Sequence, residues 1–451
     1  MKLIQSVKTT AYLVLMTMTV SACKGDGKAS STPAEWKPVS VRVVQIPGGF
    51  RLERQGRPYR IRGAGATQHF ERIKEAGGNS VRLWTADYAG PLLDEAHRNG
   101  LTVMLGLWLT PEGKGIDYND RTAVQTQLQR IRGEVLRFRK HPALLMWCVG
   151  NELDLGQVNP KMYSAINEVA VMIHKLDPNH PVTTPLAMIA TSIPLLQRRA
   201  PAIDFLSVNK YAGLNKLPEQ LRKIGWQGPY IVTEYGSKGY WESDSTQWAV
   251  PVELNSAEKA AFIAKRYRHT MIEDSAHCMG SYVFFWGTKF EKTPTWFSLF
   301  SEEGEKTLAV DTLQYLWQGK KPANFAPSIV GMTLAGKRDV NSPRLRTNTE
   351  YPATAVVRDP EGQALTADWE LWPELPPTGN AEEAVEPLSG YVSHASTHGA
   401  TLRTPLKPGA YRLLLWIHDG HGGVATANIP FYCEGGKSGQ AVNSQAGAQL
   451  R

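Results

Sequence analysis

The sequence predicts an α/β protein, a (β/α)8 TIM barrel followed by a small all-β sandwich. Three observations favour this fold class. The chain has 451 residues, of which 42% are hydrophobic and 20% charged, as is typical of globular proteins with room for about two or three domains. Up to about residue 285, apolar strand-like runs alternate with segments of helical period. From about Asn324, short alternating segments bounded by turn residues replace the helical period.

Eight apolar runs are the predicted strands of the barrel, which we place at residues 41–322. Continuous apolar runs such as Leu144–Val149 are typical of parallel strands that are buried on both faces. One of the helices between them is predicted to begin near Asn255, where Glu258 can complete a capping box. Eight such units fit a closed barrel better than a doubly wound sheet. A hairpin of Val41–Ile46 and Phe50–Arg54 precedes them, and the eight runs are Tyr59–Gly63, Ser80–Trp84, Thr102–Leu107, Leu144–Val149, Val182–Pro185, Phe205–Asn209, Tyr230–Thr233 and Ser281–Phe285.

Residues 323–436 are predicted to form the β-sandwich. A glycine-rich turn after His418 joins two of its strands, and Asp419 and His421 lie in that turn. These three side chains could be metal ligands, but a hairpin turn accounts for them, so we predict no metal site. The predicted strands are Ser328–Leu334, Tyr351–Arg358, Ala367–Trp372, Gly409–Ile417 and Val424–Tyr432.

The first residues predict export and anchoring. Lysines, a short apolar stretch and small residues before Cys23 resemble a bacterial lipoprotein signal, so residues 1–22 are expected to be removed and Cys23 to be lipidated. The alternative is an ordinary secretory signal with a chance cysteine. Residues 23–40 are expected to form a flexible tether, and residues 437–451 a disordered tail. The resemblance implies a lipid-anchored envelope protein, in the outer membrane of a Gram-negative bacterium.

Charge and cysteine content exclude some other classes. The net charge is +8, from 50 Lys and Arg against 42 Asp and Glu, and the excess is spread thinly along the chain. Since no basic run is interleaved with stacking aromatic residues, we do not expect a nucleic-acid partner. Four widely spaced cysteines do not form a disulfide scaffold.

Two glutamates follow predicted strands at the barrel end where catalytic groups gather. The fourth run ends in Gly150-Asn151-Glu152, and the seventh ends in Thr233-Glu234. Because the carboxyl ends of all barrel strands surround one mouth, we expect Glu152 and Glu234 to face each other. Two facing carboxyl groups suit cleavage of a glycosidic bond, in which one protonates the leaving oxygen and the other attacks the sugar carbon. The alternative is that each glutamate pairs with a basic residue as scaffolding.

These motifs resemble the retaining glycosidases of glycoside hydrolase clan A, most closely the barrel domain of family 2-like enzymes. The resemblance covers about residues 41–321 and implies that Glu152 is the general acid/base and Glu234 the nucleophile, with no cofactor. It also implies that Asn151 hydrogen-bonds the sugar 2-hydroxyl and that Arg82 keeps the nucleophile ionised. The other candidate substrate-binding residues are Tyr211 beside the nucleophile, Trp286 as an aromatic floor, and Trp84 and Asn209 at strand ends.

The resemblance also shapes the expected substrate. Large family 2 enzymes carry amino-terminal sandwich domains that help to close an exo-type pocket, whereas only a hairpin precedes this barrel. We therefore expect a more open cleft and a β-linked glycan, with β-glucan favoured, as the substrate of hydrolysis or of transfer to another sugar. The carboxy-terminal sandwich resembles immunoglobulin- or fibronectin-like modules that bind glycan or support the barrel. The alternative function is a non-catalytic glycan-binding or structural envelope lipoprotein on a glycosidase scaffold.

Overall fold

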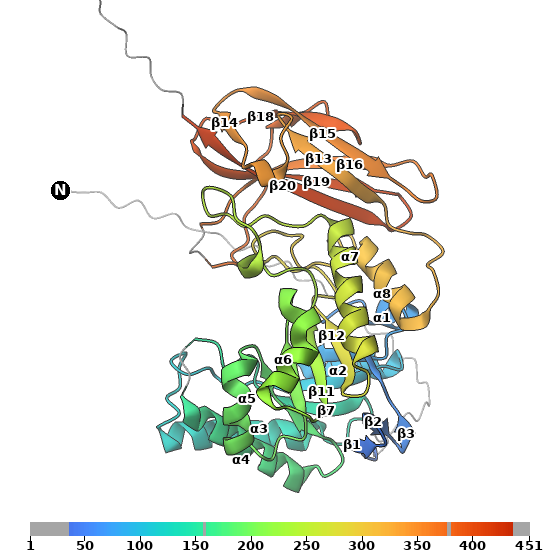
Figure 1. Ribbon diagram of the computed structural model, residues 1–451, viewed down its shortest axis with the longest axis vertical. Coiled ribbons are helices and arrows are strands. Elements are labelled where there is room, and N and C mark those ends of the chain that lie inside the picture. Colours follow the sequence, from blue (N-terminus) through green and yellow to red (C-terminus); the bar gives the residue numbers. More distant parts are fainter. Residues whose placement is uncertain (1–35, 157–158, 377–379, 436–451) are drawn as a thin grey trace, which may run out of the picture. The chain divides into compact units, whose positions relative to one another are not determined.

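The computed structural model describes residues 36–156, 159–376 and 380–435 (Figure 1). The predicted signal peptide, Cys23, most of the predicted tether and the tail at 437–451 lie outside these residues. Within the described ranges, none of the helices is both long and apolar enough to cross a membrane.

A parallel sheet of nine strands forms the barrel, in the order β8-β7-β6-β5-β4-β12-β11-β10-β9. β8 and β9 are the two ends of one segment interrupted at Thr184, so the row of strands closes on itself through residues 182–186. The predicted TIM barrel is therefore confirmed. The strands are β4 (Ile61–Gly65), β5 (Ser80–Leu83), β6 (Thr102–Leu107), β7 (Leu144–Val149), β8 (Val182–Thr183), β9 (Pro185–Leu186), β10 (Leu206–Asn209), β11 (Tyr230–Tyr235) and β12 (Cys278–Val283).

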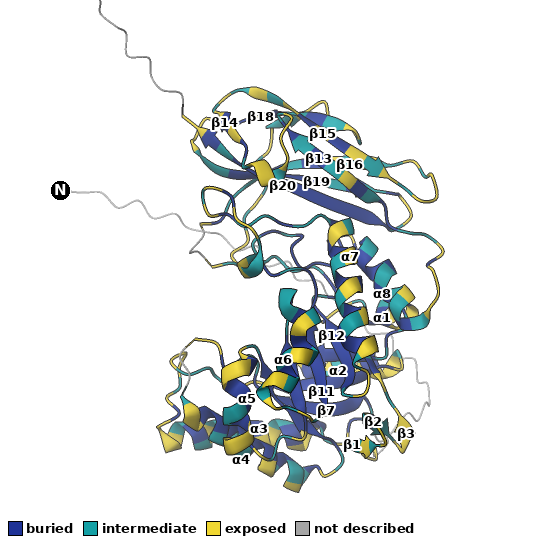
Figure 2. Cartoon of the chain, viewed as in Figure 1, coloured by how far each residue is buried: buried dark blue, intermediate teal, exposed yellow. Residues whose placement is uncertain are grey.

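Helices cover the outside of this sheet and bury it almost completely, so that β7, β11 and β12 are dark blue in Figure 2. The Asp120 side chain caps the longest helix by accepting from the backbone N–H groups of Thr122 and Ala123. The predicted capping box of Asn255 and Glu258 is present. The α-helices are α1 (Phe70–Glu75), α2 (Ala89–Arg98), α3 (Arg121–Phe138), α4 (Pro160–Leu176), α5 (Ile189–Arg199), α6 (Leu217–Ile224), α7 (Ser256–Tyr267) and α8 (Leu308–Gln318).

A three-stranded antiparallel sheet closes the amino-terminal end of the barrel. It consists of the predicted hairpin, β1 (Val41–Ile46) and β2 (Gly49–Arg54), and the short strand β3 (Arg57–Pro58). Val41 and Leu52 are buried in one apolar cluster with side chains of the barrel interior. With this end filled by apolar side chains, the carboxyl ends of the strands are the accessible mouth.

The carboxy-terminal strands form two four-stranded sheets that pack into a sandwich, which confirms the predicted fold class. The orders are β13-β15-β18-β17 and β14-β20-β19-β16. The sequence prediction missed three of these strands, because β14, β17 and β18 have only 3, 2 and 5 residues. The bounds are β13 (Ser328–Leu334), β14 (Arg344–Arg346), β15 (Glu350–Arg358), β16 (Thr366–Pro373), β17 (Val392–Ser393), β18 (Gly399–Arg403), β19 (Gly409–His418) and β20 (Val424–Glu434).

Candidate active site

Glu234 lies at the carboxyl end of β11 and is almost fully buried. Three donors from two other strand ends, those of β5 and β10, point at its carboxylate. Arg82 Nη1 lies 2.7 Å and Trp84 Nε1 2.9 Å from Oε1, and Tyr211 OH lies 2.9 Å from Oε2. Burial, and next the charge of Glu234, raises the pKa of Tyr211 well above its usual value, so this hydroxyl keeps the proton that it donates.

The guanidinium of Arg82 has no exposed surface and connects four strand ends, those of β5, β7, β10 and β11. Besides Glu234, it donates to the carbonyl oxygen of Thr233 at 2.8 Å and to Asn151 Oδ1 at 2.5 Å. Because these acceptors lie on β11 and just after β7, one fully buried cation fixes the end of β11, with Glu234, relative to the turn after β7, with Glu152.

Glu152 lies in the turn after β7 with φ at 47°, in the left-handed region that non-glycine residues seldom adopt. Asn209 Nδ2 donates to its Oε1 at 2.9 Å and also lies 3.3 Å from Asn151 Oδ1. Burial, and next the negative charge of Glu234, raises the pKa of Glu152 to about 7. A carboxyl with such a pKa is mostly protonated below about pH 7 and can act as an acid there.

These side chains line one open pocket with a volume of about 890 Å³. The structure thus brings together seven of the predicted residues, namely Arg82, Trp84, Asn151, Glu152, Asn209, Tyr211 and Glu234. All of these except the buried Arg82 contribute to the pocket wall.

The predicted aromatic floor at Trp286 needs correction. Trp286 has no exposed surface, its ring stacks on Trp317 at 5.7 Å between centroids, and its Nε1 donates to the carbonyl oxygen of His69. The reason is that β12 ends at Val283, so that Phe284 and Phe285 follow it into the pocket while Trp286 turns into the core.

Other lining residues were not predicted. They come from loops beyond the strand ends, where periodicity gives no signal. The sequence does carry a signal for Phe284 and Phe285, which end the eighth predicted run. The unpredicted side chains are Leu155, Ala187, Met188, Lys210, Tyr240, Trp241, Glu242, Phe284, Phe285, Lys289, Glu291 and Glu382.

The turn after β19 gives no support to a metal site. His418 pairs with Glu305 at 2.6 Å, and Asp419 accepts from backbone N–H groups of its own turn. Over the ranges that the structure describes, there is no cluster of three or more potential metal-binding side chains.

The fold and the arrangement of the site resemble those of a class of enzymes, the O-glycosyl hydrolases with a TIM barrel. Residues 79–302 match the family model "Glycosyl hydrolases family 2, TIM barrel domain". Over about half of its length, the chain thus resembles the barrel domain of the family 2 glycosyl hydrolases.

Similar proteins agree with this class. The chain is 26% identical over 236 residues to the β-glucuronidase of Paenibacillus borealis, covering 44% of this chain and 38% of that protein. It is 28% identical over 208 residues to the β-glucuronidase of Streptococcus agalactiae serotype V, covering 40% and 34%. The structure of Bacteroides uniformis β-glucuronidase 2, covalently bound to cyclophellitol-6-carboxylate aziridine, aligns with a TM-score of 0.50 at 13% identity, over 88% of this chain and 48% of that one. This last likeness supports the fold alone. The chain thus spans less than half the length of each of these relatives.

Proposed function

We propose that this protein is a retaining β-glycoside hydrolase in which Glu234 is the nucleophile and Glu152 the general acid/base. The observation that carries the proposal is the pair itself. One buried carboxylate receives three hydrogen bonds, and a second carboxyl with a pKa of about 7 lines the same pocket. A non-catalytic scaffold has no physical need for both environments, so the geometry favours the enzyme over the binding-protein alternative.

The two carboxyls would act in two displacement steps. In the first, Glu234 attacks the anomeric carbon while the bond to the leaving oxygen breaks and Glu152 gives that oxygen its proton. Formation of the glycosyl ester removes the charge of Glu234, which is one of the causes of the raised pKa of Glu152. In the second step, ionised Glu152 takes a proton from water, the water oxygen attacks the same carbon, and the carboxylate of Glu234 leaves.

We propose β-D-glucuronides as the substrate class. The named relatives are β-glucuronidases, and the pocket contains two lysines, Lys210 and Lys289, that could pair with a sugar carboxylate. These relatives give no support to the expected preference for β-glucan, nor to transfer in place of hydrolysis.

The test is hydrolysis by the full chain, purified in detergent, of p-nitrophenyl β-D-glucuronide, β-D-glucoside and β-D-galactoside, with β-glucan oligosaccharides as a further arm. We expect turnover of the glucuronide with the β-anomer as the first product in NMR spectra, and a loss of about a thousandfold or more in kcat for Glu234→Gln. An α-anomer would contradict retention, and preferential cleavage of the β-glucan oligosaccharides would contradict the proposed substrate.

We also propose that Cys23 carries a lipid anchor, on the basis of the sequence pattern at residues 1–23. Labelling of growing cells with a radioactive fatty acid should mark the wild-type protein and not a Cys23→Ala variant. A labelled Cys23→Ala variant would contradict this proposal.

A further inference from the structure

One wall of the active-site pocket is formed by residues 287–298, which follow β12; we call these residues the wall segment. The wall segment brings Lys289 and Glu291 to the pocket. Its Phe297 lies 5.5 Å from Tyr211 between ring centroids, and Tyr211 is the donor to Glu234. The position of the wall segment therefore affects both the pocket lining and the surroundings of Tyr211.

A buried polar network fastens the wall segment to the sandwich. Its centre is Glu253, which lies before α7 and is 3% exposed. Glu253 accepts from Thr293 at 2.7 Å and from Thr295 at 2.8 Å, both in the wall segment. It also accepts from Lys259 at 2.5 Å and from Asn428 on β20 at 2.7 Å. A buried polar group is costly to leave unpaired. These contacts therefore favour one fixed arrangement of the wall segment, α7 and β20.

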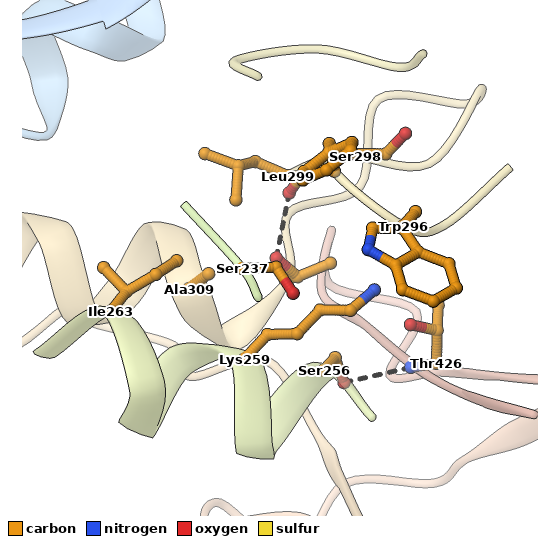
Figure 3. Close-up of a pocket in the computed structure, with 11 residues that line it drawn as sticks. Ser237, Ser256, Lys259, Ile263, Trp296, Ser298, Leu299, Ala309 and Thr426 are labelled. Carbon is orange, nitrogen blue, oxygen red and sulfur yellow. Dashed lines mark hydrogen bonds between the residues drawn. The ribbon is translucent and has the colours of Figure 1, made fainter. Parts of the chain in front are cut away.

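Figure 3 shows part of this junction. Lys259 on α7 extends toward the wall segment near Trp296, and its Nζ donates to the carbonyl oxygen of Thr295 at 2.5 Å. Beside it, the backbone N–H of Thr426 on β20 donates to Ser256 Oγ at 3.0 Å.

The sandwich itself reaches the pocket through the segment that follows β16, of which residues 374–376 and 380–388 are described; we call it the sandwich loop. The backbone N–H of Lys292 donates to the carbonyl oxygen of Ala381 at 2.6 Å, which aligns the sandwich loop with the wall segment. The next residue, Glu382, lines the pocket and forms an ion pair with Lys289. One residue of the barrel's pocket is thus supplied by the sandwich.

Negative charges outnumber positive ones around Lys289. Its ammonium contacts Glu382 and lies 3.4 Å from Glu291, so two carboxylates surround one cation. A substrate carboxylate that approaches Lys289 meets repulsion from both glutamates, and it competes with Glu382 for the same N–H donors.

We propose that Glu382 is a specificity-determining residue, supplied by the β-sandwich, that competes with the carboxylate of a uronic acid for Lys289. This inference rests on the proposed function, because it assigns the sugar-binding role to this pocket. It makes the sandwich part of the active site, where the sequence left open whether that domain binds glycan or only supports the barrel.

The test measures binding, so it does not depend on turnover. NMR titration gives the Kd of D-glucuronate and of D-glucose for the full chain and for Glu382→Gln, with Glu383→Gln as the matched control from the same loop. For Glu382→Gln we expect the affinity for glucuronate, relative to glucose, to rise about three- to tenfold, as loss of one nearby like charge predicts. For Glu383→Gln, at a position that does not line the pocket, the ratio should stay within about twofold.

A double-mutant cycle with Lys289→Gln tests the mechanism, since without the ammonium the removal of Glu382 should no longer produce the full gain. An unchanged or lower ratio for Glu382→Gln, in a protein with the wild-type circular dichroism spectrum, would overturn the inference. So would a gain of the same size in the Lys289→Gln background. Failure of the proposed function appears separately, as absence of glycoside turnover by the wild-type chain.

Discussion

At the scale of single residues, the environments of the two carboxyls differ in the way that acid and nucleophile roles require. Both carboxylate oxygens of Glu234 accept hydrogen bonds, Oε1 from Arg82 and Trp84 and Oε2 from Tyr211. Glu152 has one donor from Asn209 and otherwise meets burial and a neighbouring negative charge. Two side chains of the same type thus have the different surroundings that the proposed roles need.

The raised pKa of Glu152 predicts the pH dependence of the reaction. The acid has to be protonated in the free enzyme, so kcat/KM should fall as the pH rises through about 7 and the proton is lost. In Glu234→Gln the neighbouring charge is absent, so the pKa of Glu152 should decrease, as measured by NMR of the labelled carboxyl carbon. A pKa of Glu152 that is the same in both proteins would contradict the electrostatic part of this explanation.

Tyr211→Phe should reduce kcat by about ten- to a hundredfold, because the nucleophile loses a hydrogen bond to a charged group in a buried site. The free energy of unfolding should change much less than the activation free energy. Steady-state kinetics with a β-glycoside check the activity, and Tyr315→Phe on α8, whose side chain is about half exposed, is the control. Equal activity of Tyr211→Phe and wild type would show that the hydroxyl of Tyr211 does not contribute to the reaction.

At the scale of elements, the strands with continuous apolar runs were predictable and the short irregular ones were not. β6 and β7 have the predicted bounds, because their runs of buried residues end at clear turns. The fifth run instead forms two short strands around Thr184, whose hydroxyl donates to the carbonyl oxygen of Val149. A side-chain hydrogen bond to a strand 35 residues away in the sequence is tertiary information, and no local pattern reveals it.

The cap of α7 gives a prediction at this scale. Asn255→Ala removes the side chain that accepts from the backbone N–H of Glu258, and it should lower the free energy of unfolding by about 1 kcal/mol. Denaturant titration followed by circular dichroism measures the change. Tyr88→Ala is the control, since Tyr88 occupies the N-cap of α2 without a side-chain hydrogen bond to the helix. If both substitutions cost the same, the capping explanation fails.

At the scale of the whole molecule, a buried ion pair of the sandwich also contacts the barrel. Arg412 on β19 pairs with Glu374 at 2.5 Å, donates to Asn428 at 2.5 Å, and reaches the carbonyl oxygen of Pro251 at 2.9 Å. Both side chains of the Arg412–Glu374 pair are almost fully buried. Removing one partner leaves the other buried and without its counter-ion, which is strongly destabilising.

Arg412→Ala should therefore lower the free energy of unfolding by about 3–5 kcal/mol. Arg344→Ala is the matched control, because the Arg344–Glu434 pair is exposed and should contribute less than about 1 kcal/mol. Scanning calorimetry measures both variants. Arg412→Ala could instead split one unfolding transition into two, neither of them at a lower temperature than in the wild type. That result would show that the contacts of Arg412 do not stabilise the two domains.

The candidate site shows the same division between local and tertiary information. Glu152, Glu234 and Arg82 could be predicted because strand-end positions in a barrel converge whatever the loops do. The placement of Trp286 could not, because it depends on where β12 ends and on the packing of Trp317. Glu382 is more than one hundred residues along the chain from Glu152 and Glu234, in a loop of another domain, and only the docking of that loop brings it to the pocket.

The ion pair between Lys289 and Glu382 has a consequence for how such proteins diversify and how they can be engineered. Recombination that exchanges the sandwich for a homologous one would also exchange a side chain of the catalytic pocket, even though no residue of the barrel changes. Chimeras made at a junction near residue 323 should thus inherit part of their substrate preference from the domain that contains neither Glu152 nor Glu234. A library of sandwich loops on a constant barrel is then a direct way to vary that preference.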